Sequence, residues 1–296
     1  MKYPIGIQTF DKIIDGGYVY VDKTDLIYQL VQGNIYFLGR PRRFGKSLLV
    51  STLEQYFRGN KELFKGLAID KLETEWKQYP VFHIDFSTGN YLNDGVLEDV
   101  LSDNLTEWEA QYEVVKTSND LGLRFQKVLR AAHEKTGLGA VVLIDEYDKP
   151  ILDVIELDYQ VEHLGKMISL EEKHRNIMKS FYTTFKGADA DLRFVFLTGV
   201  TKFSQISMFS GFNQPADISL SRNYEALCGI TKDELVKYFA EPIAEIAQIY
   251  HCTEEEMLQK LKMKYDGYHF SEKMVDVFNP FSLLNAFYNM KLGGYW

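Results

Sequence analysis

Short apolar runs alternate along the chain with longer stretches in which apolar residues recur at helical spacing. The apolar runs are residues 35–38, 81–86, 140–144 and 194–197. Runs of this length are typical of strands that are covered on both faces of a sheet. Helical spacing follows residue 45 and recurs over residues 96–112, 120–136 and 171–187. Strands that alternate with helices predict an α/β fold, with a mostly parallel sheet flanked by helices.

The first residues differ from this alternation. A turn at Asp15-Gly16-Gly17 is followed by the apolar and aromatic residues 18–21, which predict a short strand or an extended arm. We therefore interpret residues 1–32 as a lead-in segment and residues 33–225 as one α/β core.

Beyond about residue 225 the pattern becomes helical. Residues 231–234 and 253–256 both fit the capping box, in which a hydroxyl and a carboxylate satisfy free amides at the start of a helix. Asn279-Pro280 fits a helix cap followed by proline at the first helical position. Residues 226–296 are therefore predicted to form a small helical subdomain.

Composition and charge narrow the class of partner. The chain has 296 residues, of which 46% are hydrophobic and 25% charged, ordinary proportions for a folded protein; its net charge, −9, is acidic. Nucleic acid is not indicated as a partner, because neutralising phosphates needs clustered Lys and Arg. No apolar run approaches ~18 residues and no export signal follows Met1, so no membrane span is expected. Cys228 and Cys252 form no metal or redox spacing, and we expect a reduced, cytoplasmic setting.

The candidate chemistry begins at residues 39–47, Gly-Arg-Pro-Arg-Arg-Phe-Gly-Lys-Ser. A phosphate-binding loop reads G-x-x-x-x-G-K-[ST], but here the first glycine comes one position early, at Gly39, and residue 40 is arginine. An apolar strand precedes the loop and an amphipathic helix follows it, which is the arrangement that phosphate binding needs. The alternative is a solvated polar loop with a helix cap.

Each part of this loop has a predicted role. Backbone amides and the positive end of the helix cradle phosphate oxygens. Lys46 reaches the β- and γ-phosphates, and Ser47 offers its hydroxyl to Mg²⁺. Gly39 and Pro41 are predicted to make the turn at the entrance, and the arginines that follow to add positive charge. The predicted nucleotide-binding residues are Gly39, Arg40, Pro41, Arg42, Arg43, Phe44, Gly45, Lys46, Ser47 and Leu48.

Residues 140–148, Ala-Val-Val-Leu-Ile-Asp-Glu-Tyr-Asp, match the Walker B pattern. A buried strand delivers Asp145 to the carboxyl edge of the sheet, where open α/β sheets bind ligands. Asp145 is predicted to hold Mg²⁺ through water, and Glu146 to orient and polarise the attacking water. The alternative is a strand end followed by a polar loop. Asp148, a third acid, either tunes the site or caps the next turn.

Taken together, these segments resemble a known family. The segments that carry the resemblance are PIGIQTF…YVDKTDLI, RPRRFGKSLL, LIDEYDKPI, TGVTKFS, GFNQPADIS, CGITKDEL, YDGYHF and NPFSLLN. The set is spread over nearly all of residues 3–290 and resembles the bacterial AAA-ATPase-like family. The resemblance implies a P-loop NTPase core of the AAA type with a helical lid, and it makes the displaced glycine a trait of the group.

The resemblance also adds candidates for catalysis. In AAA-type ATPases a polar residue after the strand at residues 194–197 helps to position the water, and Thr198 and Lys202 fit that place. Thr198 alternatively only ends the strand. An arginine finger would raise turnover by about 10³–10⁵. Its candidates, among which the sequence does not choose, are Arg175, Arg193 and Arg222.

The leading hypothesis is Mg²⁺-dependent ATP hydrolysis by Lys46, Ser47, Asp145 and Glu146. A nucleotide-binding regulatory switch with little turnover is the main alternative, and a P-loop small-molecule kinase is a third. The expected partner is either further copies of the chain or a C-terminal effector domain.

Members of the family often carry a PD-(D/E)XK nuclease-like domain after the ATPase. This sequence ends in Tyr295-Trp296 before such a domain would begin, and we expect the natural protein to continue. Within the chain, Glu171-Glu172-Lys173 contains a nuclease-like Glu-x-Lys, but no suitably placed Pro-Asp precedes it. We interpret it as a surface charge cluster and expect no nuclease activity here.

Overall fold

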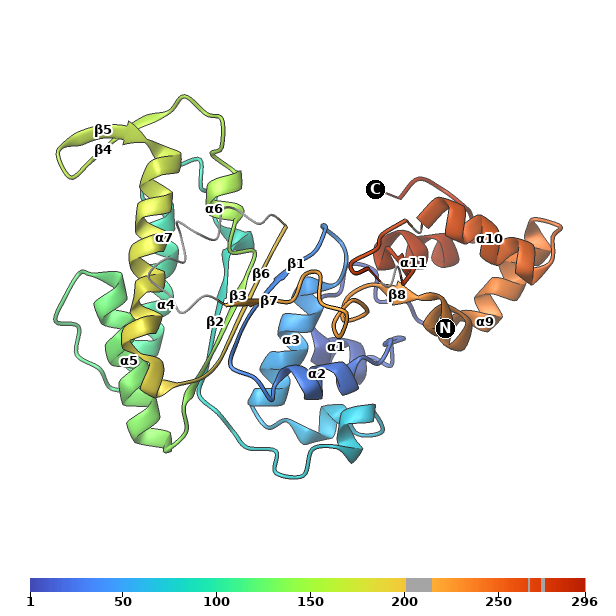
Figure 1. Ribbon diagram of the computed structural model, residues 1–296, viewed down its shortest axis with the longest axis horizontal. Coiled ribbons are helices and arrows are strands. Elements are labelled where there is room, and N and C mark those ends of the chain that lie inside the picture. The colour runs from blue at the N-terminus through green and yellow to red at the C-terminus, as the bar shows by residue number, and fades with distance from the viewer. Residues whose placement is uncertain (201–214, 266, 273–274, 296) are drawn as a thin grey trace.

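The computed structural model describes residues 1–200, 215–265, 267–272 and 275–295. The predicted candidate Lys202 lies outside these residues. Five strands form one parallel sheet in the order β2-β3-β6-β1-β7, at the centre of Figure 1. They are β1 (Ile35–Gly39), β2 (Val81–Asp85), β3 (Ala140–Asp145), β6 (Leu192–Gly199) and β7 (Ala216–Asp217). The expected α/β fold with a parallel sheet is confirmed.

Both faces of this sheet are buried, as its continuous apolar strands predict. All six residues of β3 are buried, and their side chains alternate between two hydrophobic cores. Val142 and Ile144 belong to the core on one face, and Val141 and Leu143 to the core on the other. This alternation leaves polar residues of β3 only at its carboxyl end.

Helices cover each face of the sheet, as Figure 1 shows. The face of Val142 is covered by α4 (Val96–Gln111), α5 (Leu121–Thr136) and α7 (Leu170–Gly187). The face of Val141 is covered by α1 (Phe10–Asp15), α2 (Thr24–Leu30) and α3 (Lys46–Phe57). The shorter helices are α6 (Lys149–Leu152), η1 (Lys61–Phe64), η2 (Ala68–Lys71), η3 (Phe86–Thr88) and η4 (Asp189–Asp191). The three long helices expected from their spacing are confirmed to within one residue at each end.

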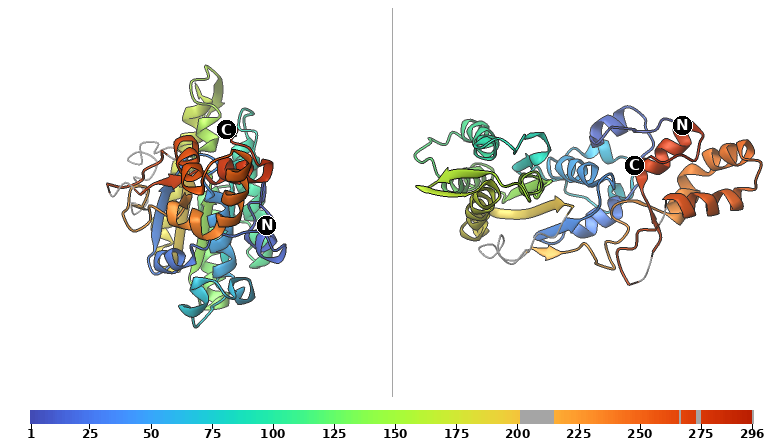
Figure 2. Two further views of the ribbon diagram at one scale, coloured as in Figure 1. Left: turned by 90° about the vertical axis from the view of Figure 1, so that its right-hand side faces the viewer. Right: turned by 90° about the horizontal axis from the view of Figure 1, so that it is seen from above.

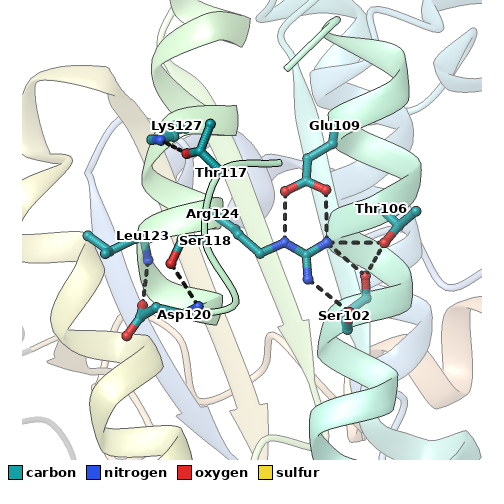
Figure 3. A network of polar contacts seen from close by, with 9 residues as sticks. All are labelled: Ser102, Thr106, Glu109, Thr117, Ser118, Asp120, Leu123, Arg124 and Lys127. Atoms are coloured by element: carbon teal, nitrogen blue, oxygen red, sulfur yellow. Dashed lines mark hydrogen bonds and ion pairs between the residues drawn. The ribbon is translucent and has the colours of Figure 1, made fainter. Parts of the chain in front are cut away.

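A buried ion pair fixes α4 against α5 (Figure 3). The guanidinium of Arg124 on α5 donates from two nitrogens to the two carboxylate oxygens of Glu109 on α4, at 2.8 Å each. The hydroxyls of Ser102 and Thr106 on α4 accept from the same guanidinium, at 2.8 and 3.1 Å. Only 2% of Arg124 is exposed. The positive charge of Arg124 is therefore neutralised by one carboxylate in a bidentate ion pair.

A hairpin formed by β4 (Gln160–His163) and β5 (Lys166–Ser169) projects from the start of α7 (Figure 1). Its two-residue turn holds Leu164 and Gly165 at φ of 53° and 76°. Positive φ at both positions is typical of a type I′ turn, which usually carries asparagine or aspartate at the first. The sequence pattern does not predict this hairpin, because leucine there gives no turn signal.

The interpretation of Lys173 as part of a surface charge cluster is wrong. The side chain of Lys173 is buried, and its ammonium pairs with the carboxylates of Asp94 and Glu98 at 2.5 and 2.8 Å. A buried ammonium needs such partners, because burial without them is costly. These two ion pairs tie α7 to the start of α4.

The C-terminal helices form a unit with its own hydrophobic core at one end of the molecule (Figures 1 and 2). The elements of this unit, which we call the lid, are β8 (Ile230–Thr231), α9 (Lys232–Ile249), α10 (Glu254–Tyr265), β9 (Val277–Phe278) and α11 (Pro280–Asn289). Pro242 lies inside α9, and the helix is kinked at Phe239. The predicted caps are confirmed: Thr231 and Thr253 form capping boxes, and Asn279 accepts from the Ser282 amide at 3.0 Å.

The start of the chain joins the lid to the core. Residues 18–21 do not form a strand; Val19 and Val21 instead pack on the lid core, and the ring of Tyr3 stacks on Phe287 of α11 at 6.4 Å. Lys23, at the start of α2, pairs with Glu234 of the α9 capping box at 2.6 Å. Figure 2 shows the N-terminus beside the lid.

Candidate functional site

The Gly-Lys-Ser loop connects the end of β1 to the start of α3. Gly39 still belongs to β1, and the positive φ angles lie at Arg43 (66°) and Gly45 (88°). The prediction that Gly39 and Pro41 make the turn is therefore wrong. Gly39 is kept in the strand because its amide donates to Ser219 Oγ at 2.7 Å, while the Arg40 amide donates to the Gly199 carbonyl at 3.1 Å.

The backbone amides of the loop are open to an anion. No hydrogen bond joins the N–H groups of residues 43–48 to any other residue in the part of the chain that the structure describes. A Cβ built on Gly45 would have no atom within 4 Å. Free amides at the start of a 12-residue helix form a ready-made site for phosphate oxygens.

The side chain of Lys46 curls back over this loop. Its ammonium donates to the carbonyl oxygens of Arg40 and Pro41, at 3.0 Å each. Burial lowers the pKa of Lys46, and the negative charges of Asp145 and Glu146 oppose that shift. The lysine and the acidic pair of β3 thus lie within electrostatic reach of each other.

Arg40 does not face this space. Its guanidinium donates to the carbonyl oxygens of Ser219 and Tyr224, at 2.5 and 3.2 Å, and lies 4.0 Å from the ring centre of Phe270. Only 1% of the residue is exposed. The structure therefore gives the Arg40 side chain a role in holding the loop, while the exposed Arg42 and Arg43 line the open side.

The carboxyl ends of β3 and β6 bring three predicted residues together. The Thr198 hydroxyl donates to Asp145 Oδ1, and the Glu146 amide donates to the same oxygen at 3.0 Å. The Glu146 amide also lies 3.4 Å from Thr198 Oγ1. Thr198 is thus a positioning residue for the Asp145 carboxylate. Asp148 is used differently: its Oδ2 accepts from the Val200 amide at 2.8 Å, and its side chain does not cap α6.

Glu146 occupies a strained and shielded position. Its φ of 52° is a left-handed conformation that costs a non-glycine residue of order 1 kcal/mol or more. Burial raises the pKa of Glu146, and the neighbouring Asp145 raises it further. A carboxyl with a raised pKa is a candidate for proton transfer.

Asp85 is a neighbour that the sequence analysis missed. Asp85 ends β2 directly opposite Asp145 in the sheet register. Its carboxylate accepts from the Ser87 amide and hydroxyl, at 2.8 and 2.9 Å, and contributes to the raised pKa of Glu146. The sequence does carry a signal for Asp85, because it is an acidic residue at the end of an apolar run. The carboxyl ends of parallel strands lie at the same edge of the sheet, so Asp85 is expected near Asp145.

A cavity of about 380 Å³ opens between the loop, the N-terminal segment and the lid. This volume lies within the usual range for small-molecule sites, roughly 300–1,000 Å³. From the predicted set the walls contain Arg42, Arg43, Gly45, Lys46, Ser47, Leu48 and Glu146. Residues that the sequence analysis did not predict complete the walls: Pro4, Ile5, Gly6, Ile7, Gln8, Pro280, Phe281, Leu284 and Asn285.

The donor set fits a magnesium ion held mainly by phosphate and water. Asp145 Oδ2 and Ser47 Oγ make no hydrogen bond to any described residue. Over the same residues, no group of three or more His, Cys, Asp or Glu side chains could hold a metal ion. Mg²⁺ usually takes one or two protein ligands plus substrate phosphates. Ser47 and Asp145 would therefore hold the ion only together with a bound phosphate group.

The three arginine-finger candidates all have partners within the chain. Arg175 pairs with Glu171 at 2.7 Å, and Arg222 pairs with Glu272. Arg193 donates to the carbonyl oxygens of Val31 and Gly33, at 2.6 and 2.9 Å. Arg193 therefore has a structural role in this chain, because both bonds fix the approach to β1.

The parallel sheet, with a loop and helix after its first strand, is consistent with a P-loop NTPase-like fold. The chain belongs to the AAA-ATPase-like family: the model of that family, described as predicted AAA-ATPase, matches residues 4–209. The chain is also 38% identical over 297 residues to a protein of Azotobacter chroococcum mcd 1 described as an uncharacterized protein in the vnfD 5′ region. All of this chain is covered, but it spans only 53% of that relative's length.

No solved structure matches the chain. Among the described residues, no helix combines the length and the apolar character that crossing a membrane requires.

Proposed function

We propose that this chain binds ATP with Mg²⁺ and hydrolyses the terminal phosphate. One observation carries the proposal: a loop with free amides and a buried lysine shares one cavity with Glu146, next to the carboxylate of Asp145. Phosphoryl transfer depends mainly on positioning and on charge at the transferred group. The cavity offers both.

Each group has a distinct task in this proposal. The amides of residues 43–48 bind the phosphate oxygens, and Lys46 exchanges its two carbonyl partners for the β- and γ-phosphates. Mg²⁺, held through Ser47 and Asp145, would neutralise developing charge on the phosphates. Thr198 keeps the Asp145 carboxylate in place. Glu146 accepts a proton from the attacking water, a role that its raised pKa favours.

A second, apolar pocket supports a nucleoside triphosphate as the ligand. It shares Pro4, Gly45, Leu48, Pro280 and Leu284 with the first cavity, and most of its other residues are apolar, including Tyr20, Leu49 and Ile230. Ligand pockets of this kind are mostly apolar with a few polar groups. A base stacked there would leave its phosphates at the loop.

The test is phosphate release and nucleotide affinity measured on the purified protein and on Lys46→Ala. We expect the substitution to lower the hydrolysis rate by at least about 10²-fold, because it removes the charge on the phosphates. Leu164→Ala, at the tip of the hairpin, is the control and should keep the wild-type rate. A rate that Lys46→Ala leaves unchanged would reject the proposal.

A nucleotide-dependent switch with little turnover is the second candidate. The loop contacts the lid directly, with Arg43 lying 4.2 Å from the ring centre of Phe281 on α11, so an occupied loop can bias the lid. Glu146→Gln separates the two candidates. Hydrolysis should fall about 10²–10⁴-fold with affinity retained; tight binding without turnover in both proteins would favour the switch. Partners, whether copies of this chain or a C-terminal effector domain, are part of either proposal.

A further inference from the structure

The residues that make this loop unusual all lie against aromatic rings of α11 or of the segment between α10 and β9. The Arg40 guanidinium lies 4.0 Å from the ring centre of Phe270, and that of Arg43 lies 4.2 Å from Phe281. The ring of Phe44 meets Tyr268 edge-on at 4.6 Å and Phe270 at 5.5 Å. Thus each of the three side chains contacts a ring more than 200 residues away in the sequence.

The backbone follows the same arrangement. The amide of Gly229, at the start of the lid, donates to the Phe44 carbonyl at 3.2 Å. Gly229 has a φ of 91°, and a Cβ there would lie 2.1 Å from Val277 and 3.3 Å from the ring of Phe44. Glycine at this position fits the positive φ and the close approach of Val277 in β9, and it leaves the ring of Phe44 in tight contact.

These contacts replace what a glycine-rich loop obtains from its own backbone. Without glycine at residue 40, and with Arg43 at positive φ, the loop carries strain that other contacts must hold. The guanidinium groups lie over the rings of Phe270 and Phe281, an interaction that a lysine would not reproduce in the same way.

We propose that Phe281 and Phe270 are positioning residues that hold the phosphate-binding loop in its anion-ready shape through Arg43 and Arg40. The proposal rests on the proposed function, in which the loop binds nucleotide phosphates. Phe281 is the sharper case. It is only partly buried and is not part of any of the hydrophobic cores formed by the described residues, so its replacement leaves the lid core intact.

The first measurement needs no nucleotide. Hydrogen–deuterium exchange of the Gly39, Arg40 and Leu49 amides, which are the hydrogen-bonded amides on either side of the loop, should become faster in Phe281→Leu and in Phe270→Leu. Phe281→Tyr keeps a ring and should restore the wild-type rate. Tyr288→Leu, on the same helix with an exposed ring, is the matched control and should change nothing. Unchanged loop exchange in both leucine variants would overturn the proposal.

The second measurement is the affinity for Mg²⁺ with a non-hydrolysable ATP analogue. Phe281→Leu should weaken it about tenfold, and Phe281→Tyr should rescue it. In an Arg43→Met background the same Phe281→Leu change should cost nothing more, because its effect passes through Arg43. A full additional loss would mean that Phe281 touches the ligand itself, and would overturn the positioning role. If no variant and no wild-type protein binds the analogue while loop exchange still responds, the proposed function fails and the loop contacts stand.

Discussion

The molecule buries cationic side chains in two regions, and the two regions differ in whether a carboxylate neutralises the charge. Arg124, between α4 and α5, meets a carboxylate with two matched hydrogen bonds. Lys46 and Arg40, at the loop, are equally buried but have only carbonyl oxygens and a ring as partners among the described residues. In the first region the positive charge of Arg124 is neutralised by the carboxylate of Glu109. Of the two cations at the loop only Lys46 lines the cavity, and its ammonium has no carboxylate partner among the described residues, as the proposed phosphate site requires.

The largest expected difference is between Arg124→Met, which should lower the stability of the fold, and Lys46→Met, which should abolish hydrolysis. Arg124→Met leaves Glu109 buried without its partner and should lower the free energy of unfolding by about 3 kcal/mol. Lys46→Met removes a charge that has no carboxylate partner and should leave stability unchanged or raise it by about 1 kcal/mol, while hydrolysis is lost. Urea unfolding and phosphate release measure the two effects.

The double variant Arg124→Met/Glu109→Leu is the control for this comparison. Replacing a buried ion pair by apolar residues is often close to neutral, so most of the lost stability should return. A Lys46→Met protein that unfolds as easily as Arg124→Met would show that the lysine is a structural cation as well.

Ligand addition should affect the two regions unequally. Mg²⁺-ATP at about 100 times its Kd should stabilise the wild-type protein by about 2.7 kcal/mol. Arg124→Met should gain the same amount, because its change lies away from the loop, whereas Lys46→Met should gain little. Thermal melting with and without the non-hydrolysable analogue gives the difference. An equal gain in both variants would contradict the role given to Lys46.

Acid should weaken only the paired region. The hydrogen bond from Arg124 lowers the pKa of Glu109 in the folded protein. The pair therefore stabilises the fold above the unfolded carboxyl pKa of about 4.5, and this contribution is lost as the pH falls through the folded value. Glu109→Gln should flatten that part of the stability curve between pH 5 and 3, measured by urea unfolding. A curve as steep as that of the wild type would assign the acid sensitivity to other carboxylates.

Raising the pH should produce the smallest effect: through Lys46 at the loop, the free energy of unfolding should increase, whereas acid decreases it through Glu109. Burial lowers the pKa of Lys46 in the folded protein, so the unfolded chain binds the proton more tightly. Stability should then rise with pH between the folded pKa and the unfolded value of about 10.4. Lys46→Met lacks this rise, and its stability advantage over the wild type should shrink as the pH rises toward the unfolded value. A constant difference across that range would argue against a desolvated lysine.

The elements set by local pattern were predicted well from the sequence. The apolar runs identified β1, β2, β3 and β6, and the caps at Thr231, Thr253 and Asn279 identified the starts of the lid helices. The motif spacing also placed Lys46 and Glu146 on one cavity. These features depend on neighbours within a few residues, and the sequence carries that information directly.

The rest depends on contacts that join distant segments. Arg40 is predicted from the sequence to contact phosphate, but its guanidinium donates to the carbonyls of Ser219 and Tyr224, which come from a segment about 180 residues away. It missed the walls contributed by residues 4–8 and α11 for the same reason. Lys173 was taken for a surface residue, since its partner Asp94 comes from a segment 79 residues away. Such pairings follow from tertiary packing and leave no trace in local periodicity.

The carboxylate of Glu234, at the base of the lid, accepts hydrogen bonds from two separate parts of the molecule. Its oxygens accept from the Thr231 amide, which closes the start of α9, and from the Lys23 ammonium, which belongs to the core. Swinging the lid away from the core removes the ammonium and leaves the acid to the helix alone; fraying the helix frees the acid and loosens its tie to the core. Lid rotation and the melting of the first turn of α9 are therefore thermodynamically linked, and a change in one is registered by the other.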